Sequence, residues 1–154
     1  PNDAQIAQIV VSADRSEISA SKLAEEKSKN PEIRDFAKMM IDAHGAVTKK
    51  TKDLADRIDL HPKSSDTSRS LAKETKKNAK KLKSLNGESF DKEYIDQMVA
   101  GHEKVLETID RDLIPNAKNP ELNSPVEEIR PDVVHHLERA KPLHAKLENP
   151  SNSG

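Results

Sequence analysis

The chain of 154 residues has the length of one domain and carries 26 basic and 27 acidic residues, a net charge of −1. This balance gives no overall field to attract nucleic acid, the absence of Cys excludes disulfides and thiolate ligands, and no apolar run of about 18 residues could span a membrane. With only 33% apolar and 2% aromatic residues, the composition favours long amphipathic helices around a thin core.

The first two predicted helices each place one titratable side chain in the core. Residues 3–28 repeat apolar positions at steps of three and four, and Glu17 falls on the same stripe. A short turn follows, so a second helix over residues 30–60 should lie antiparallel to the first. Asn30 is its expected N-cap, and His44 occupies the middle of its apolar stripe.

The third helical region is expected to break at Asn86-Gly87, because both residues tolerate the left-handed conformation that ends a helix. The part before the break, residues 67–85, should form a short extra helical arm. After the break the apolar pattern continues to Leu113, with His102 in the middle of the stripe.

The last predicted helix begins at Asn119-Pro120 and ends near Leu147, with His136 in the middle of a seven-residue apolar repeat. Its interior prolines are expected to bend it. The elements together predict an all-α fold: a four-helix up-down bundle with a broken third helix that forms an extra arm. Residues 1–148 should form this single domain, and residues 149–154 a disordered tail.

Each of the four long helices thus supplies one titratable group to the core. Glu17 and His44 lie 13 and 14 residues from Asn30, so their heights should agree to about 1.5 Å. His102 and His136 are level with one another to about 4–5 Å by the same reasoning. We therefore expect these four side chains to converge in one layer of the bundle.

Two interpretations of this layer stay open from the sequence. Three imidazoles and a carboxylate, Glu17, His44, His102 and His136, suit a divalent transition metal such as Zn²⁺, with Cu²⁺, Ni²⁺ or Fe²⁺ as alternatives. Alternatively, the carboxylate bonds to neutral histidines, and the network fixes helix register without a metal.

No catalytic or organic-cofactor site is predicted. The Glu-x-x-His pairs of di-iron bundles are missing, since Ile41, Val99 and Val133 stand three residues before the core histidines. Hydrolase, nucleotide-binding and Rossmann motifs are also missing from the sequence. The sequence therefore favours a protein without enzymatic activity.

A run of lysines on the expected arm most simply keeps that helix face solvated. The alternative is docking to an anionic surface through Lys73, Lys76, Lys77, Lys80 and Lys81. Nucleic acid is not an expected partner, because the run has no aromatic side chains to stack on bases. The remaining histidines lie off the apolar stripes and are interpreted as surface residues: His61, His135 and His144.

Four stretches resemble a known family: MMIDAHGAV, LNGESFDKEY, QMVAGHEKVL and the Pro-x-x-x-x-His-Leu of residues 131–137. In order and spacing they are similar to the bacterial exported family catalogued as domain of unknown function 4142, over almost the whole chain. The matching site positions are His44, His102, His136 and Glu17. The chain departs from the family at Ala43 and Gly101, where an Asp commonly precedes the histidine.

The resemblance implies a ferritin-like bundle without an assigned activity, exported to the periplasm or cell envelope after removal of a signal peptide. We therefore expect an exported, non-enzymatic binding or interaction protein with an envelope partner of unknown identity. The alternative is a transition-metal-binding protein that uses the core cluster for sequestration or stress protection.

Overall fold

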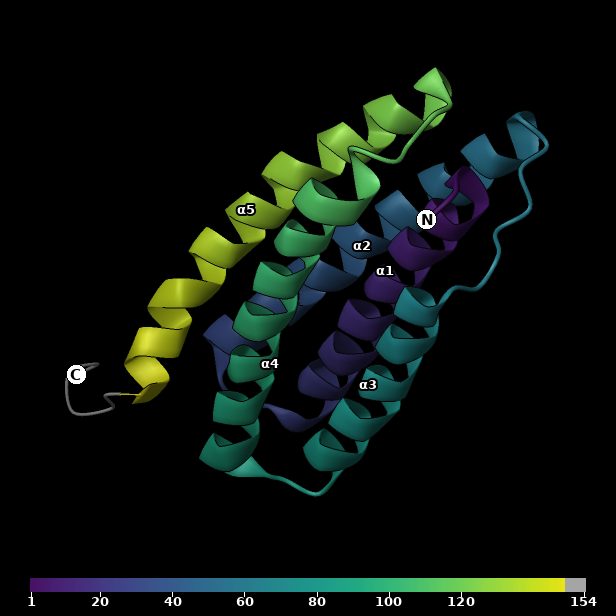
Figure 1. Ribbon diagram of the computed structural model, residues 1–154. Coiled ribbons are helices and arrows are strands. Elements are labelled where there is room, and N and C mark those ends of the chain that lie inside the picture. The colour runs from purple at the N-terminus through teal and green to yellow at the C-terminus, as the bar shows by residue number, and fades with distance from the viewer. Residues whose placement is uncertain (149–154) are drawn as a thin grey trace.

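The computed structural model describes residues 1–148, in which every regular element is helical (Figure 1). The elements are α1 (Asp3–Lys27), α2 (Pro31–Arg57), α3 (Asp66–Lys83), α4 (Gly87–Thr108), the π-helical turn η1 (Ile109–Leu113) and α5 (Pro120–Glu148). The predicted all-α class is confirmed, as no strand occurs in this part of the chain. The predicted tail, residues 149–154, lies outside the described residues.

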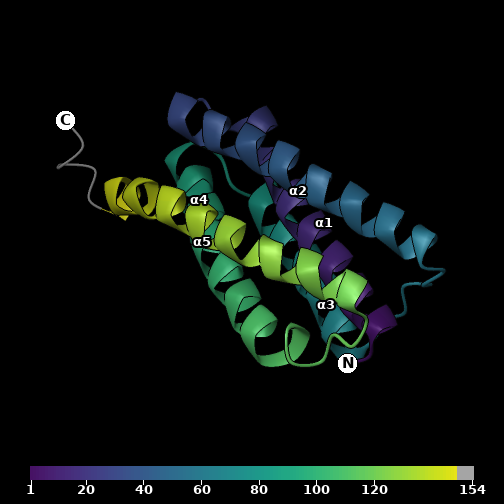
Figure 2. The ribbon, with the colours of Figure 1, turned by 90° about the horizontal axis from the view of Figure 1, so that it is seen from above.

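Four helices form a ring in which every neighbour is antiparallel. α1 contacts α2 and α4, and α5 contacts the same two helices from the opposite side (Figure 2). The start of α2 meets the end of α5 through Glu32 and Lys146, and the reverse ends meet through Arg57 and Glu121. The predicted four-helix up-down bundle is confirmed.

The fifth helix, α3, packs lengthwise on the outside of the ring. It runs beside α1 and in the same direction, and Lys27 of α1 donates to the carbonyl oxygens of Leu82 and Lys83 at 3.2 and 2.9 Å. The predicted break is confirmed, because the chain reverses between α3 and α4 and Gly87 has φ +61°. The extra arm is therefore a helix that covers α1 and does not project from the bundle (Figure 1).

Side-chain caps fix the starts of α2 and α5 as predicted. The backbone amides of Glu32 and Glu121 donate to the side-chain oxygens of Asn30 and Asn119 at 3.0 and 2.9 Å. The prolines inside α5 do not end that helix, which is continuous through them.

The second helix ends at Arg57, before the predicted limit at residue 60. Asp59 adopts a left-handed conformation with φ 53°, and the amide of Leu60 donates to the carbonyl of Ala55 at 2.7 Å. These features form a Schellman motif, which ends the helix although its left-handed position carries Asp and not Gly.

The core consists of two apolar clusters, one toward each end of the bundle. The first includes Ala24, Phe36, Met40, Phe90, Tyr94 and Met98, and the second includes Ile6, Val10, Leu54, Ile109, Val126 and Val133. Along every long helix, the predicted titratable residue lies between a residue of one cluster and a residue of the other. The fold thus places a polar layer between two apolar halves.

The lysines of α3 are exposed, as expected for a solvated face. Lys81 also forms an ion pair with Glu93 of α4 at 2.6 Å. Docking to an anionic surface stays a hypothesis. Within residues 1–148, no helix is sufficiently long and apolar to cross a membrane.

Two glycine substitutions should have opposite effects on stability. Gly87→Ala should lower the free energy of unfolding by about 1–2 kcal/mol, because an L residue is strained at positive φ. Gly45→Ala should raise it by about 0.5–1 kcal/mol, because Ala is the better helix former and a Cβ there meets nothing within 4 Å. Urea denaturation of both variants measures these changes, and a stabilised Gly87→Ala would contradict the backbone assignment.

Candidate metal centre

Three imidazoles meet in the middle of the bundle, one each from α2, α4 and α5. The ring centroids of His44, His102 and His136 are 5.5, 5.6 and 5.7 Å apart, and all three residues are buried. One ligand nitrogen of each histidine lies within 4.8 Å of those of the other two. The predicted convergence of the histidines is confirmed, because the antiparallel ring brings residues equally far from their turns to one height.

Each of these histidines has a buried ring nitrogen without a hydrogen-bond partner among the described residues. These nitrogens are Nε2 of His44, Nε2 of His102 and Nδ1 of His136. His102 donates from Nδ1 to the carbonyl oxygen of Met98 at 2.7 Å, so its neutral ring carries a lone pair on Nε2. The backbone of α4 thereby selects the tautomer that a metal ligand requires.

Asp14 forms a hydrogen bond with the ring of His44, although it is not among the residues predicted from the sequence. Nδ1 of His44 lies 2.9 Å from Oδ1 of Asp14, whose Oδ2 accepts from the hydroxyl of Thr48 at 3.1 Å. Asp14 precedes Glu17 by one helical turn, and Thr48 follows His44 by one turn. That spacing places all four polar side chains on the facing sides of α1 and α2, a signal that a search for apolar stripes overlooks.

Glu17 also points into this layer, but it lies outside the group formed by the histidines. Its Oε2 is 3.7 Å from Nδ1 of His102, the nitrogen that already donates to α4. A Cβ on Gly101 would lie 2.8 Å from Oε1 of Glu17. The glycine that distinguishes this chain from the family pattern therefore leaves room for the carboxylate of Glu17, whose role as a ligand stays a prediction.

Burial keeps two of the histidines neutral. It lowers the pKa of both His102 and His136 to about 4, and the nearby charge of His44 acts in the same direction. At neutral pH, their lone pairs are therefore available to a metal.

The third histidine behaves differently. Burial alone would lower the pKa of His44, but its hydrogen bond to Asp14 and the charges of Glu17 and Asp14 outweigh this effect and raise it. Asp14 has a raised pKa as well, chiefly because it is buried. A metal that binds Nε2 of His44 would compete with a proton, so metal binding should release protons.

Spacing and a neighbouring cavity decide whether the three histidines could bind a metal ion. The ligand nitrogens lie within 4.8 Å of one another. Metal–nitrogen bonds of about 2.0 Å in tetrahedral coordination would require separations of about 3.3 Å, so side-chain rotations would have to shorten each distance by up to about 1.5 Å. A cavity of ≈ 100 Å³ borders His44 and His102 and extends to the exposed Glu74 and Lys104. Its volume is sufficient for a few water molecules, and it provides a route from the surface between α3 and α4.

The other histidines lie away from this layer. His61 and His135 are exposed, which confirms their interpretation as surface residues. His144 is half-buried, and its Nε2 lies 2.7 Å from Asp96 of α4.

The buried carboxylate of Glu17 provides a test of the site by pH. Burial raises its pKa from 4.5 to about 7, so the unfolded state releases this proton at a lower pH than the folded state does. Between pH 4.5 and 7, Glu17 therefore makes the fold less stable as the pH rises. We expect Glu17→Gln to become more stable than the wild type across this range, by about 3 kcal/mol at pH 7 and above.

Urea denaturation of the metal-free protein from pH 4 to 8 measures this difference. Glu26→Gln, an exposed change on the same helix, is the control and should differ little from the wild type at any pH. A difference in the free energy of unfolding between Glu17→Gln and the wild type that does not vary with pH would contradict the raised pKa of Glu17.

The fold is similar to that of two solved structures. Among solved structures, a protein from Streptomyces coelicolor described as a secreted DUF305 protein has a TM-score of 0.80 at 14% identity, covering 95% of this chain and 93% of its own. CopM in the Cu(II)-bound form has a TM-score of 0.73 at 17% identity, covering 95% and 97%. These likenesses confirm the predicted ferritin-like helical bundle.

Comparison with the curated proteins finds no match. The profile of one family, described as Domain of unknown function (DUF4142), matches residues 1–143, which include all four residues predicted for the site. The sequence resemblance is therefore confirmed, and this chain belongs to the DUF4142 family.

Proposed function

We propose that this chain binds one divalent transition-metal ion in its bundle core through His44, His102 and His136. The observation that carries the proposal is the set of three buried ring nitrogens, each without a partner in residues 1–148, on three different helices. The function of such a protein would be metal sequestration or protection from metal stress, without catalysis.

A register-fixing network accounts for this geometry less well. Such a network would pair the buried nitrogens with one another or with Glu17, yet no hydrogen bond between two of the three rings occurs in the described part. Each buried polar group left without a partner costs about 1–3 kcal/mol. The hydrogen bonds that do form, from His44 to Asp14 and from His102 to Met98, involve the opposite ring nitrogens. This arrangement leaves the other ring nitrogens available to bind a cation.

The donor chemistry favours Cu²⁺ and Zn²⁺. Imidazole nitrogens suit both ions, and the stability order of divalent metals makes Cu²⁺ the tighter of the two at a given nitrogen site. The structural neighbour CopM was solved in a Cu(II)-bound form, which supports copper as the first ion to test.

Export to the periplasm or cell envelope is part of the proposal. The family resemblance implies it, and one structural neighbour is described as secreted. The lack of a catalytic role is also proposed, since Ile41, Val99 and Val133 occupy the positions at which a di-iron centre would place a carboxylate. A binding protein that handles metal outside the cytoplasm fits these observations together.

Metal should stabilise the wild-type protein, and this effect should require the core histidines. At a free Cu²⁺ concentration 100 times the Kd, the free energy of unfolding should rise by about 2.7 kcal/mol. Calorimetric melting of protein prepared without an affinity tag measures this rise. His102→Ala and His136→Ala should lose most of this rise, whereas the exposed neighbour His135→Ala should retain it. Equal stabilisation of all four proteins would refute the core site.

Asp14 should increase the affinity of the core site for Cu²⁺, although it is not one of the proposed ligands. Asp14→Asn keeps the shape of the side chain but weakens the hold on the ring of His44, so the Kd for Cu²⁺ should increase about 10- to 100-fold. Asp42→Asn, an exposed change two residues from His44, is the matched control and should leave the Kd unchanged. Competition with a chelator of known affinity measures both values, and equal Kd values would exclude the role of Asp14.

A further inference from the structure

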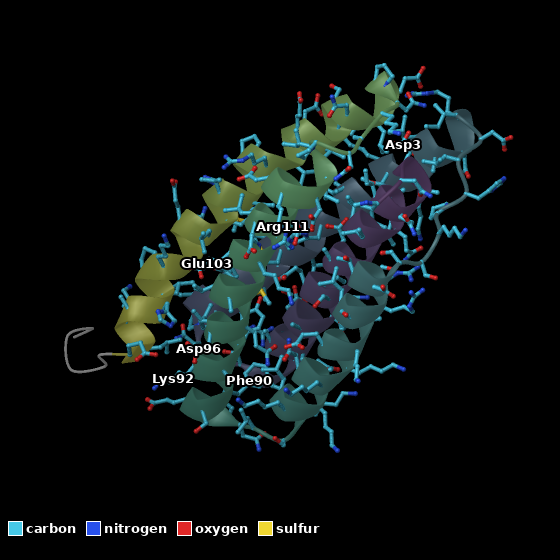
Figure 3. The ribbon with its side chains drawn as sticks, viewed as in Figure 1. Asp3, Phe90, Lys92, Asp96, Glu103 and Arg111 are labelled. Carbon is cyan, nitrogen blue, oxygen red and sulfur yellow. The ribbon has the colours of Figure 1, made fainter. Side chains whose placement is uncertain are left out.

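A second cluster of potential ligands lies between α4 and α5, toward the carboxyl end of α5. Asp96 comes from α4, and His144 and Glu148 lie one turn apart on α5. One ligand atom of each lies within 4.8 Å of those of the other two. Figure 3 labels Asp96 and Lys92 on the part of α4 that lies beside this end of α5. The side chains are 40%, 36% and 43% exposed respectively, so an ion could reach them directly from solvent.

The two carboxylates of this cluster share one imidazole nitrogen. Nε2 of His144 lies 2.7 Å from Oδ1 of Asp96 and 3.6 Å from Oε1 of Glu148, so both carboxylates approach the same nitrogen. One N–H can donate a good hydrogen bond to only one of them. Glu148 otherwise has a loose ion pair with Lys92, at 3.9 Å. A cation among the three side chains would bind both carboxylates and the ring nitrogen at once.

We propose that Asp96, His144 and Glu148 form a second, surface site for a divalent transition-metal ion. One imidazole and two carboxylates suit Zn²⁺, with water completing its coordination. The surface site should bind more weakly than the buried one, because its side chains are exposed, it offers one imidazole and not three, and Lys92 competes for Glu148. This inference does not depend on metal binding in the core.

The two sites are separate, although both use residues of α4 and α5. His144 follows His136 by eight residues on α5, and Asp96 precedes His102 by six residues on α4. These spacings correspond to about 12 and 9 Å along the helix axes, so no ligand is common to both sites. Each site can therefore be removed without the other.

Titration calorimetry with Zn²⁺ on the full chain, without an affinity tag, tests the proposal. We expect His144→Ala to bind one ion fewer than the wild type, and Glu148→Gln to weaken the same ion about tenfold or more. His135→Ala, a change of an exposed histidine on the same helix, should match the wild type. Unchanged binding by both His144→Ala and Glu148→Gln would overturn the proposal.

A change at Lys92 should increase the affinity for Zn²⁺, whereas the changes at His144 and Glu148 should decrease it. Lys92→Gln removes the cation that competes for Glu148, so the surface site should bind Zn²⁺ about two- to fivefold more tightly. Weaker binding in this variant would count against the site.

The core histidines separate this inference from the proposed function. His102→Ala should lose the core ion and keep the ion that depends on His144. A wild-type protein that binds a single ion, lost in His144→Ala but kept in His102→Ala, would support the surface site and refute the core site. Loss of that single ion in His102→Ala alone would do the reverse.

Discussion

The structure depends on one constraint: a bundle with a thin core buries a layer of titratable groups halfway along its length. Asp14, Glu17 and the three core histidines lie between two apolar clusters that hold the ends of the bundle together. Ionisable groups in such a place are costly unless they are neutral, paired or bound to a cation. The shifted pKa values follow from this cost, since burial makes His102 and His136 weak bases and Glu17 a weak acid.

Hydrogen bonds decide what this layer can do. The carbonyl of Met98 and the carboxylate of Asp14 each hold one nitrogen of an imidazole and leave the other free. If an ion binds as proposed, the rings of His44 and His102 would lose less rotational freedom than unrestrained side chains, although they would still have to move toward the ion. The apolar clusters on either side add rigidity, because close-packed side chains resist displacement. This arrangement of held and free ring nitrogens is the basis of the proposed metal site.

The additional helix α3 changes the environment of the layer. It covers the outer side of α1, and the cavity between it and α4 extends from exposed side chains to His44 and His102. The break at Gly87 sets this arrangement, because the reversal of the chain there places α3 beside α1.

The sequence alone determined the helices, their caps at Asn30 and Asn119, the break near Gly87 and the convergence of the histidines. These features follow from local propensity and from counting residues to a shared turn, since antiparallel neighbours are level when those counts agree. Only the tertiary structure decided the place of α3, the hold of Asp14 on His44, the fit of Glu17 against Gly101 and the meeting of Asp96 with His144. Each of these depends on which faces of two helices touch and how their side chains turn, and sequence spacing along one helix is not sufficient to determine this.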